Sequence, residues 1–178
     1  MEAEEGLVIP VRLAELSDVL KSLQEEHYGL AQELHQFDMV LQSMVDACVP
    51  GNIDWKHSVQ AIRVRTIGFA AQLKQHLRIE DEKLIPELEA CFAEEEAAPS
   101  IRFSSLLMEQ YFWTGLSYLK LFIDQTEQLI EFKSTKDLKR LLYYLREALI
   151  HLSEYFKVEQ EYVFDQAVRM LDDDRREG

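Results

Sequence analysis

Four ionisable side chains occupy helical positions where an apolar residue is expected. His27 and Glu159 each interrupt a row of apolar residues, mostly leucines, that recurs every seven residues along their segments. His76 and Glu80 are four residues apart, so they lie on one helix face, one turn from each other. Burying a lone carboxylate is costly unless it is paired, protonated or bound to a cation. Two imidazoles and two carboxylates in one core therefore favour a site for iron, zinc or manganese, although each residue alone is also compatible with a packing role.

Long helices are needed to bring these residues to the same level along one core. Glycine and proline are scarce, six and four in 178 residues, and apolar positions follow a helical period. The pattern predicts four helices, over about residues 17–47, 54–95, 100–132 and 135–171. Ser17 is the expected N-cap of the first helix, and Pro86 is expected to kink or end the regular part of the second. Residues 6–11 are the one extended candidate, and residues 172–178 are expected to be a frayed tail.

The connections between these helices are short, so neighbouring helices are expected to run antiparallel. The fold class predicted from the sequence is all-α, an up-down-up-down four-helix bundle in which residues 1–178 form a single domain.

The two halves of the chain resemble each other. The segment 25–28 has a counterpart at 108–111, which places Gln110 opposite His27. The segment 76–86 has a counterpart at 155–165, which places Tyr155 opposite His76 and Glu159 opposite Glu80. Each half is thus a helical hairpin that contributes one residue from its first helix and a pair from its second. This repeat predicts a pseudo-symmetric site with two centres.

With these motifs, Glu26-His27 and His76-x-x-x-Glu80 followed by an acid-rich run to Pro86, the chain resembles the hemerythrin-like HHE cation-binding domain family over nearly its whole length. The resemblance implies two irons bridged by two carboxylates and by oxygen. It implies that His27 and His76 hold one iron, and that Glu80 and Glu159 bridge to the second. The second iron would need histidines at positions 110 and 155, where this chain has Gln110 and Tyr155.

These replacements leave three outcomes open. One metal ion could bind through His27, His76, Glu80 and Glu159. Two irons could bind, with Tyr155 as a phenolate ligand. Without metal, Gln110 and Tyr155 could instead donate hydrogen bonds to the carboxylates as neutral fillers. We rank the single-metal site first and the metal-free bundle second.

Composition excludes several functions. The chain has 33 acidic and 19 basic residues and a net charge of −14, which disfavours nucleic acid and anionic membranes as partners. Two cysteines outside any CxxC pair, and an acidic N-terminus without an apolar core, predict a cytoplasmic protein. The Glu-x-x-His motif of di-iron oxidases is absent, as are the hydrolase and phosphate-loop motifs. The sequence therefore favours a non-enzymatic protein.

Two functions remain. The first is a metal-binding protein with a partial site for iron, one ion or two, or for zinc or manganese. The family resemblance implies a role in oxygen, iron or redox-stress response, with dioxygen or another small diatomic molecule as a ligand. The alternative is a metal-free bundle that acts as a homodimerisation or partner-binding module. Part of an aromatic stretch could form this docking face, although we favour the interpretation that the stretch is a well-buried helix: Tyr111, Phe112, Trp113, Tyr118 and Phe122.

Overall fold

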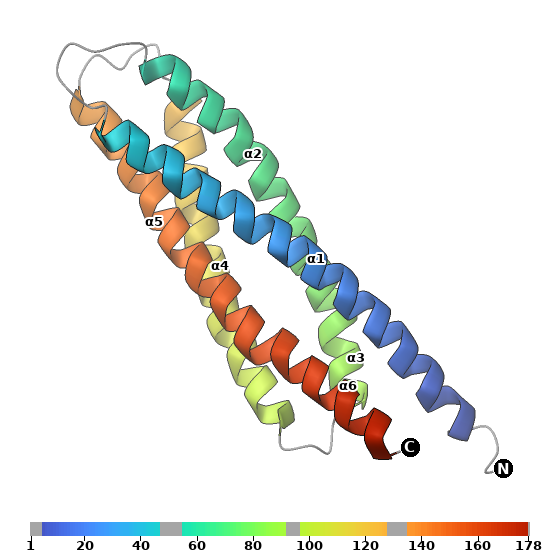
Figure 1. Ribbon diagram of the computed structural model, residues 1–178. Helices are drawn as coiled ribbons and strands as arrows, with labels where there is room; N and C mark the ends of the chain where they lie inside the picture. Colours follow the sequence, from blue (N-terminus) through green and yellow to red (C-terminus); the bar gives the residue numbers. More distant parts are fainter. Residues whose placement is uncertain (1–4, 47–54, 92–96, 128–134, 178) are drawn as a thin grey trace.

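The protein consists of four long helical segments, and no strand occurs in the part of the chain that is described (Figure 1). The computed structural model describes residues 5–46, 55–91, 97–127 and 135–177. The first segment is α1 (Glu5–Asp46), and the third is α4 (Ala97–Glu127). The second segment runs without a break through α2 (Trp55–Ile79), the π-helical turn η1 (Glu80–Leu84) and α3 (Ile85–Cys91). The fourth likewise comprises α5 (Thr135–Glu159), the π-helical turn η3 (Gln160–Phe164) and α6 (Asp165–Glu177).

The four segments enclose one elongated core. Helix α1 packs against α2 and α5, and α4 packs against the same two helices, so each segment has two neighbours. The N- and C-termini lie at the same end of the molecule (Figure 1). The prediction of an all-α fold is confirmed. Across the described residues, no helical stretch combines the length and hydrophobicity that a bilayer-spanning segment requires.

The core is built from apolar residues spaced three or four apart, which form one stripe along each helix. Fully burying one leucine or phenylalanine contributes about 1.5–3 kcal/mol, so these stripes dominate the stability of the fold. Along α1 the buried apolar residues are Leu16, Leu20, Leu23, Leu30, Leu34, Phe37, Leu41 and Met44. His27 falls in the only gap of this series within residues 16–44.

The ends of the helices differ from the prediction in two places. Helix α1 begins at Glu5, so residues 6–11 are helical and Ser17 lies inside the helix instead of capping it. A short extended segment would need a partner strand for its backbone hydrogen bonds, whereas a helix satisfies them internally. At the other end, the predicted frayed tail is helical as far as Glu177, because no glycine or proline interrupts the chain before Gly178.

The remaining ends agree more closely. Helix α4 starts at Ala97, slightly before the predicted residue 100, and Pro99 sits in its first turn, where the missing amide proton is not needed. The predicted ends near residues 47, 95 and 132 lie outside the described residues.

Two π-helical turns occupy matching places in the second and fourth segments. In η1 the Ile85 amide donates to the Glu80 carbonyl, and in η3 the Asp165 amide donates to the Gln160 carbonyl. The regular α-helix is interrupted after Ile79, seven residues before Pro86, and it resumes at Ile85, so that Pro86 lies in the first turn of α3 instead of ending the helix. In η3, however, the residue matching Pro86 is Asp165, so proline is not the common cause. Each turn has a buried carboxylate next to its beginning, Glu80 as the first residue of η1 and Glu159 directly before η3. π-Helical turns are frequent at functional sites.

Gly115 sets the closest approach of α4 to α5. A Cβ atom at this position would lie 2.6 Å from Leu152 Cγ, a buried side chain with little room to move. We expect Gly115→Ala to lower the free energy of unfolding by about 1–3 kcal/mol through overpacking. The control is Gly68→Ala, where no atom lies within 4 Å and the gain in helix propensity should stabilise by about 0.5–1 kcal/mol. Chemical denaturation of both variants measures the difference, and equal shifts in the same direction would contradict the close packing.

Candidate metal centre

Six polar side chains are buried among the described residues, and they divide into two groups. Thr66 and Thr126 each donate a hydrogen bond to a carbonyl four residues earlier in their own helix, at 2.8 and 2.7 Å, and need no other partner. The other four are His27, His76, Glu80 and Glu159, which we call the cluster. Possible ligand atoms of His27, His76 and Glu159 converge, whereas Glu80 lies outside that group and is linked to it by the charge interaction between Glu80 and Glu159. Among the described residues, the buried polar side chains are therefore two threonines with local hydrogen bonds and the four residues of one site.

Glu159 is the centre of the cluster. Its Oε2 atom lies 3.0 Å from His27 Nδ1, and its Oε1 atom lies 2.7 Å from His76 Nε2. One ligand atom from each of these three residues lies within 4.8 Å of the others. Three helical segments supply the group, His27 from α1, His76 from α2 and Glu159 from α5. Because all three are buried, a dication placed between them would be shielded from water.

Glu80 lies beside this group and bonds to a different partner. The Tyr155 hydroxyl donates to Glu80 Oε2 at 3.1 Å, and the Tyr155 ring packs against Phe112 with 5.6 Å between ring centroids. The other oxygen of Glu80, Oε1, is buried and has no hydrogen-bond partner. A buried polar atom without a partner is costly, and a metal ion is one way to satisfy it.

His76 is held from a second side by a residue that the sequence analysis did not place in the site. Glu26 Oε2 lies 3.5 Å from His76 Nδ1, too far for a good hydrogen bond, and Nδ1 has no other partner. A carboxylate on the outer nitrogen of a ligating histidine fixes the ring and raises its basicity. The signal available in the sequence is that Glu26 directly precedes the core residue His27.

The charges of the cluster shift its pKa values in opposite directions. Burial opposes ionisation of Glu159, yet the hydrogen bonds from His27 and His76 outweigh it and lower the pKa of Glu159. Burial disfavours the charged imidazole of His76, but Glu159 and then Glu26 raise the pKa of His76 above 6.5 overall. Burial and the charge of Glu159 raise the pKa of Glu80 well above 4.5. Compared with free side chains, these shifts favour the ionised form of Glu159, the charged form of His76 and the neutral form of Glu80.

Tyr155 lies inside the cluster, whereas Gln110 does not. The Tyr155 side chain is fully buried, and burial together with the negative charges of Glu159 and Glu80 raises its pKa well above the usual value. The Gln110 side chain is exposed on α4. The apolar stripe of α4 passes through Met108 and Phe112 instead, so Phe112 is the residue that this helix packs against Tyr155. A Gln110 donor to the buried carboxylates, which was one part of the metal-free outcome, is absent.

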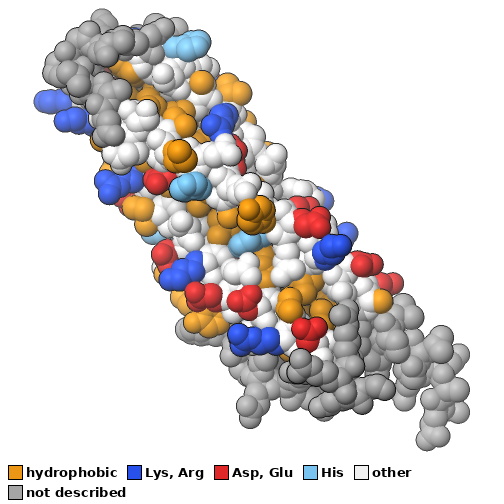
Figure 2. All heavy atoms as spheres, viewed as in Figure 1, with side chains coloured by type: hydrophobic (Ala, Val, Ile, Leu, Met, Phe, Trp, Pro, Cys, Tyr) orange, Lys and Arg blue, Asp and Glu red, His pale blue; other side chains and the backbone are white. Residues whose placement is uncertain are grey.

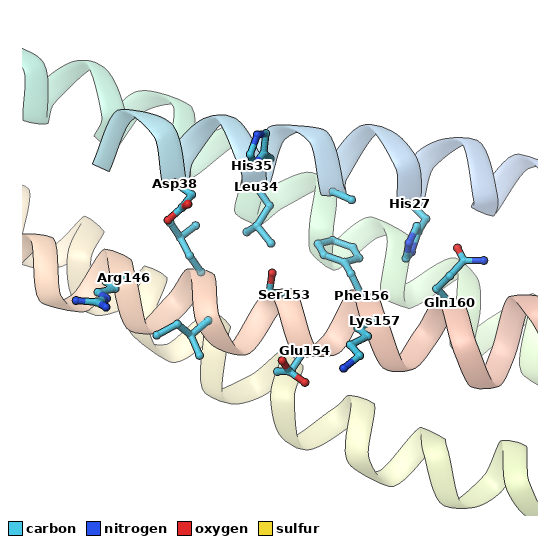
Figure 3. A pocket seen from close by; sticks show the side chains of 13 residues that line it. His27, Leu34, His35, Asp38, Arg146, Ser153, Glu154, Phe156, Lys157 and Gln160 are labelled. Atoms are coloured by element: carbon cyan, nitrogen blue, oxygen red, sulfur yellow. The ribbon is translucent and has the colours of Figure 1, made fainter. Parts of the chain in front are cut away.

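A groove between α1 and α5 leads from the surface to His27. It encloses about 660 Å³, and Figure 3 shows His27 pointing from α1 toward α5, with Phe156 and Gln160 nearby. His27 is 8% exposed, whereas Glu80 is 1% exposed and His76 and Glu159 are 0% exposed. The rings of Phe156 and Phe164 each lie 5.1 Å from the His27 ring and fix its position. From this groove, His27 is the member of the cluster that a small molecule reaches.

No protein-family model, curated protein or solved structure matches this chain. The assignment of the site accordingly rests on its own geometry and chemistry. Two imidazoles and one carboxylate around an open position are the donor set of non-haem ferrous sites, and zinc also takes histidine with carboxylate. His27, His76 and Glu159 fit one such ion, and Glu80, which lies outside this group, has a buried oxygen without a hydrogen-bond partner.

Proposed function

We propose that the protein is a non-enzymatic, hemerythrin-like metal-binding bundle with up-down-up-down topology that holds one metal ion, preferentially iron. The ligands are His27, His76 and Glu159, with Glu80 as a fourth donor. The observation that carries the proposal is the convergence of these buried side chains, with ligand atoms of the first three within 4.8 Å of one another. Glu80 Oε1, a buried oxygen without a hydrogen-bond partner in the same cluster, supports it.

The physiological role proposed is a response to oxygen, iron or redox stress in the cytoplasm. The resemblance to hemerythrin-like domains suggests this role. The groove at His27 supports it, because the groove lets a small molecule such as dioxygen reach one side of the centre while His76, Glu80 and Glu159 stay covered. Zinc or manganese are the alternative ions for the same donors.

Elemental analysis of protein purified without chelators tests the metal site. We expect about one equivalent of metal in the wild type, and its loss in His76→Ala, because that substitution removes a ligand from a site with few donors. His57→Ala is the matched control, since His57 is exposed on the same helix. Equal metal content in the two variants, or none in the wild type after reconstitution, would contradict the assignment.

Tyr155 is proposed as a hydrogen-bond donor to Glu80 and not as a metal ligand. Its raised pKa disfavours the phenolate, and its hydroxyl proton is used by Glu80. We expect Tyr155→Phe to retain its metal and to lower the free energy of unfolding by about 1–3 kcal/mol. Metal content and chemical denaturation measure both effects. A visible charge-transfer band in the iron form of the wild type that disappears in Tyr155→Phe would instead favour the two-iron site with a tyrosinate ligand.

A second candidate function is a metal-free partner-binding or dimerisation module. It is favoured by the internal hydrogen bonds of the cluster, which satisfy both oxygens of Glu159 without metal. Exposed large side chains also gather on α4 and α5, including Trp113, Leu121 and Tyr143. The face shown in Figure 2, by contrast, mixes acidic, basic and hydrophobic side chains. Native mass spectrometry of chelator-treated protein tests the dimer: a strict monomer contradicts it.

A further inference from the structure

A second cavity reaches the cluster from another side of the bundle. It encloses about 230 Å³ between α4 and the segment formed by α2, η1 and α3. The groove at His27, in contrast, lies between α1 and α5. Glu80 lines the second cavity, so this cavity approaches the carboxylate side of the cluster, whereas the groove approaches the imidazole of His27.

Three carboxylates line this cavity: Glu80, Asp81 and Glu109. Asp81 and Glu109 are exposed, whereas Glu80 is 1% exposed. The negative charges of Asp81 and Glu109 act on each other across the space between η1 and α4. Among the described residues that line the cavity there is no lysine or arginine to neutralise them. Carboxylate oxygens are the ligands that hard divalent cations prefer, and oxygens spaced too widely to bind an ion directly can hold it through its remaining water molecules.

An independent observation within the cavity also points to a ligand. Glu80 Oε1 is buried and accepts no hydrogen bond, although the other oxygen of the same carboxylate accepts one from Tyr155. An acidic cluster at a surface is ordinarily satisfied by water. A buried carboxylate oxygen without a partner is not, and a cation that enters through the cavity would meet this oxygen on its way to the inner centre, where the same oxygen is the proposed fourth donor.

We propose that Asp81, Glu109 and Glu80 form an outer cation-binding site, through which a hard divalent metal ion passes on its way to the inner centre. The outer site stands on its own residues, whereas the transfer step rests on the proposed function. In this arrangement Asp81 and Glu109 capture the partly hydrated ion. Glu80 then receives it, and the neighbouring Glu159 brings it to the two histidines.

The charges and ligand types support this order. Asp81 and Glu109 are exposed, whereas Glu80 and Glu159 are buried, and a protein of net charge −14 draws cations toward its surface. Oxygen ligands hold a hydrated hard cation without requiring an imidazole to lose its proton first. The two imidazoles lie beyond Glu159, so the strongest nitrogen donors are met last.

Terbium(III) is a suitable probe of the outer site, because Trp113 lines the cavity and can sensitise its luminescence. We expect chelator-treated protein to give saturable emission on tryptophan excitation. Asp81→Asn and Glu109→Gln should each weaken terbium binding about tenfold, since each removes one charge from the site. Trp113→Phe should abolish the emission while leaving bound terbium, measured after desalting, unchanged.

The matched controls are Asp38→Asn and Glu154→Gln, which remove the same charges from the groove at His27. These variants should titrate as the wild type does. Equal weakening in the controls and in the outer-site variants would show diffuse attraction to an acidic surface, and it would overturn the proposal. Emission that persists in Trp113→Phe would do the same.

Cobalt(II) tests the transfer step, because its visible bands report on nitrogen ligands at the inner centre. We expect Asp81→Asn and Glu109→Gln to slow the appearance of these bands about tenfold, with their final intensity unchanged, and added salt should reduce the difference. Asp38→Asn and Glu154→Gln should load at the wild-type rate. If the bands form at one rate in all variants, the transfer step is wrong and the inner site stands. If no bands form in the wild type, the proposed function fails, and terbium binding alone then decides the outer site.

Discussion

Replacing Glu159 with alanine is expected to abolish metal binding and to destabilise the metal-free protein by about 3–5 kcal/mol. Glu159 forms hydrogen bonds with both histidines, at 3.0 and 2.7 Å, and it is fully buried. Its loss removes a metal ligand and also the carboxylate that accepts hydrogen bonds from the two buried imidazoles, whose burial without a partner is costly. Both effects should therefore arise from one substitution, and metal should no longer raise the midpoint temperature of unfolding.

The control for this substitution is Glu161→Ala, which removes a carboxylate that is exposed on η3. Metal content by elemental analysis and chemical denaturation with and without chelator compare the two variants. If Glu159→Ala is no less stable than Glu161→Ala in chelator, the hydrogen bonds to the histidines contribute little. If it also retains metal, Glu159 is not a ligand.

The burial of the site residues could be predicted from the sequence, because helix periodicity determines which side chains face the core. His27 lies on the same row as the buried leucines Leu20 and Leu34, so its burial follows from theirs. The same reasoning places His76 and Glu80 in the core, since residues four apart share a helix face. That His27 and His76 both meet Glu159 could not be predicted. The periodicity of one helix does not determine how far that helix is shifted along its neighbours.

Gln110 shows where the sequence comparison was weaker. It was matched to His27 by the similarity of two short segments and not by the apolar stripe of its own helix. That stripe includes Met108 and Phe112, which leaves Gln110 on the exposed side. The apolar stripe of a helix predicts which side chains are buried, because burying apolar area stabilises the fold. A similarity between two short segments does not depend on burial, so it does not predict which side chains face the core. The two π-helical turns were missed for a related reason, since no residue type specifies them.

Glu80→Gln is expected to have opposite effects on the two forms of the protein. With metal, it should weaken binding by about 10–100-fold, because a carboxylate donor beside the ion becomes a neutral amide. Without metal, it should stabilise the bundle at pH 8, because a buried carboxylate next to Glu159 no longer has to ionise. The amide oxygen can still accept the hydrogen bond from Tyr155.

The pH dependence of the metal-free protein follows from the directions of the pKa shifts. Because folding raises the pKa of Glu80 above 4.5, its contribution to stability is complete below pH 4.5 and is lost as pH rises through the raised value. His76 acts in the same direction: its contribution is complete below pH 6.5 and is lost above it. Glu159, with a lowered pKa, contributes above pH 4.5 and loses this contribution in acid.

Thermal unfolding in chelator between pH 5 and pH 8 separates these contributions. The wild type should lose stability across this range, and Glu80→Gln should lose less, because only the part due to His76 remains. Glu82→Gln is the matched control, since Glu82 is exposed in the same π-helical turn. If Glu80→Gln is less stable than this control at pH 8 without metal, the buried carboxylate does not destabilise the metal-free protein. Metal binding would then have no such destabilisation to remove. A stabilising effect in chelator combined with weaker metal binding is what distinguishes a ligand held ready for a cation from a carboxylate that serves only the packing of the core.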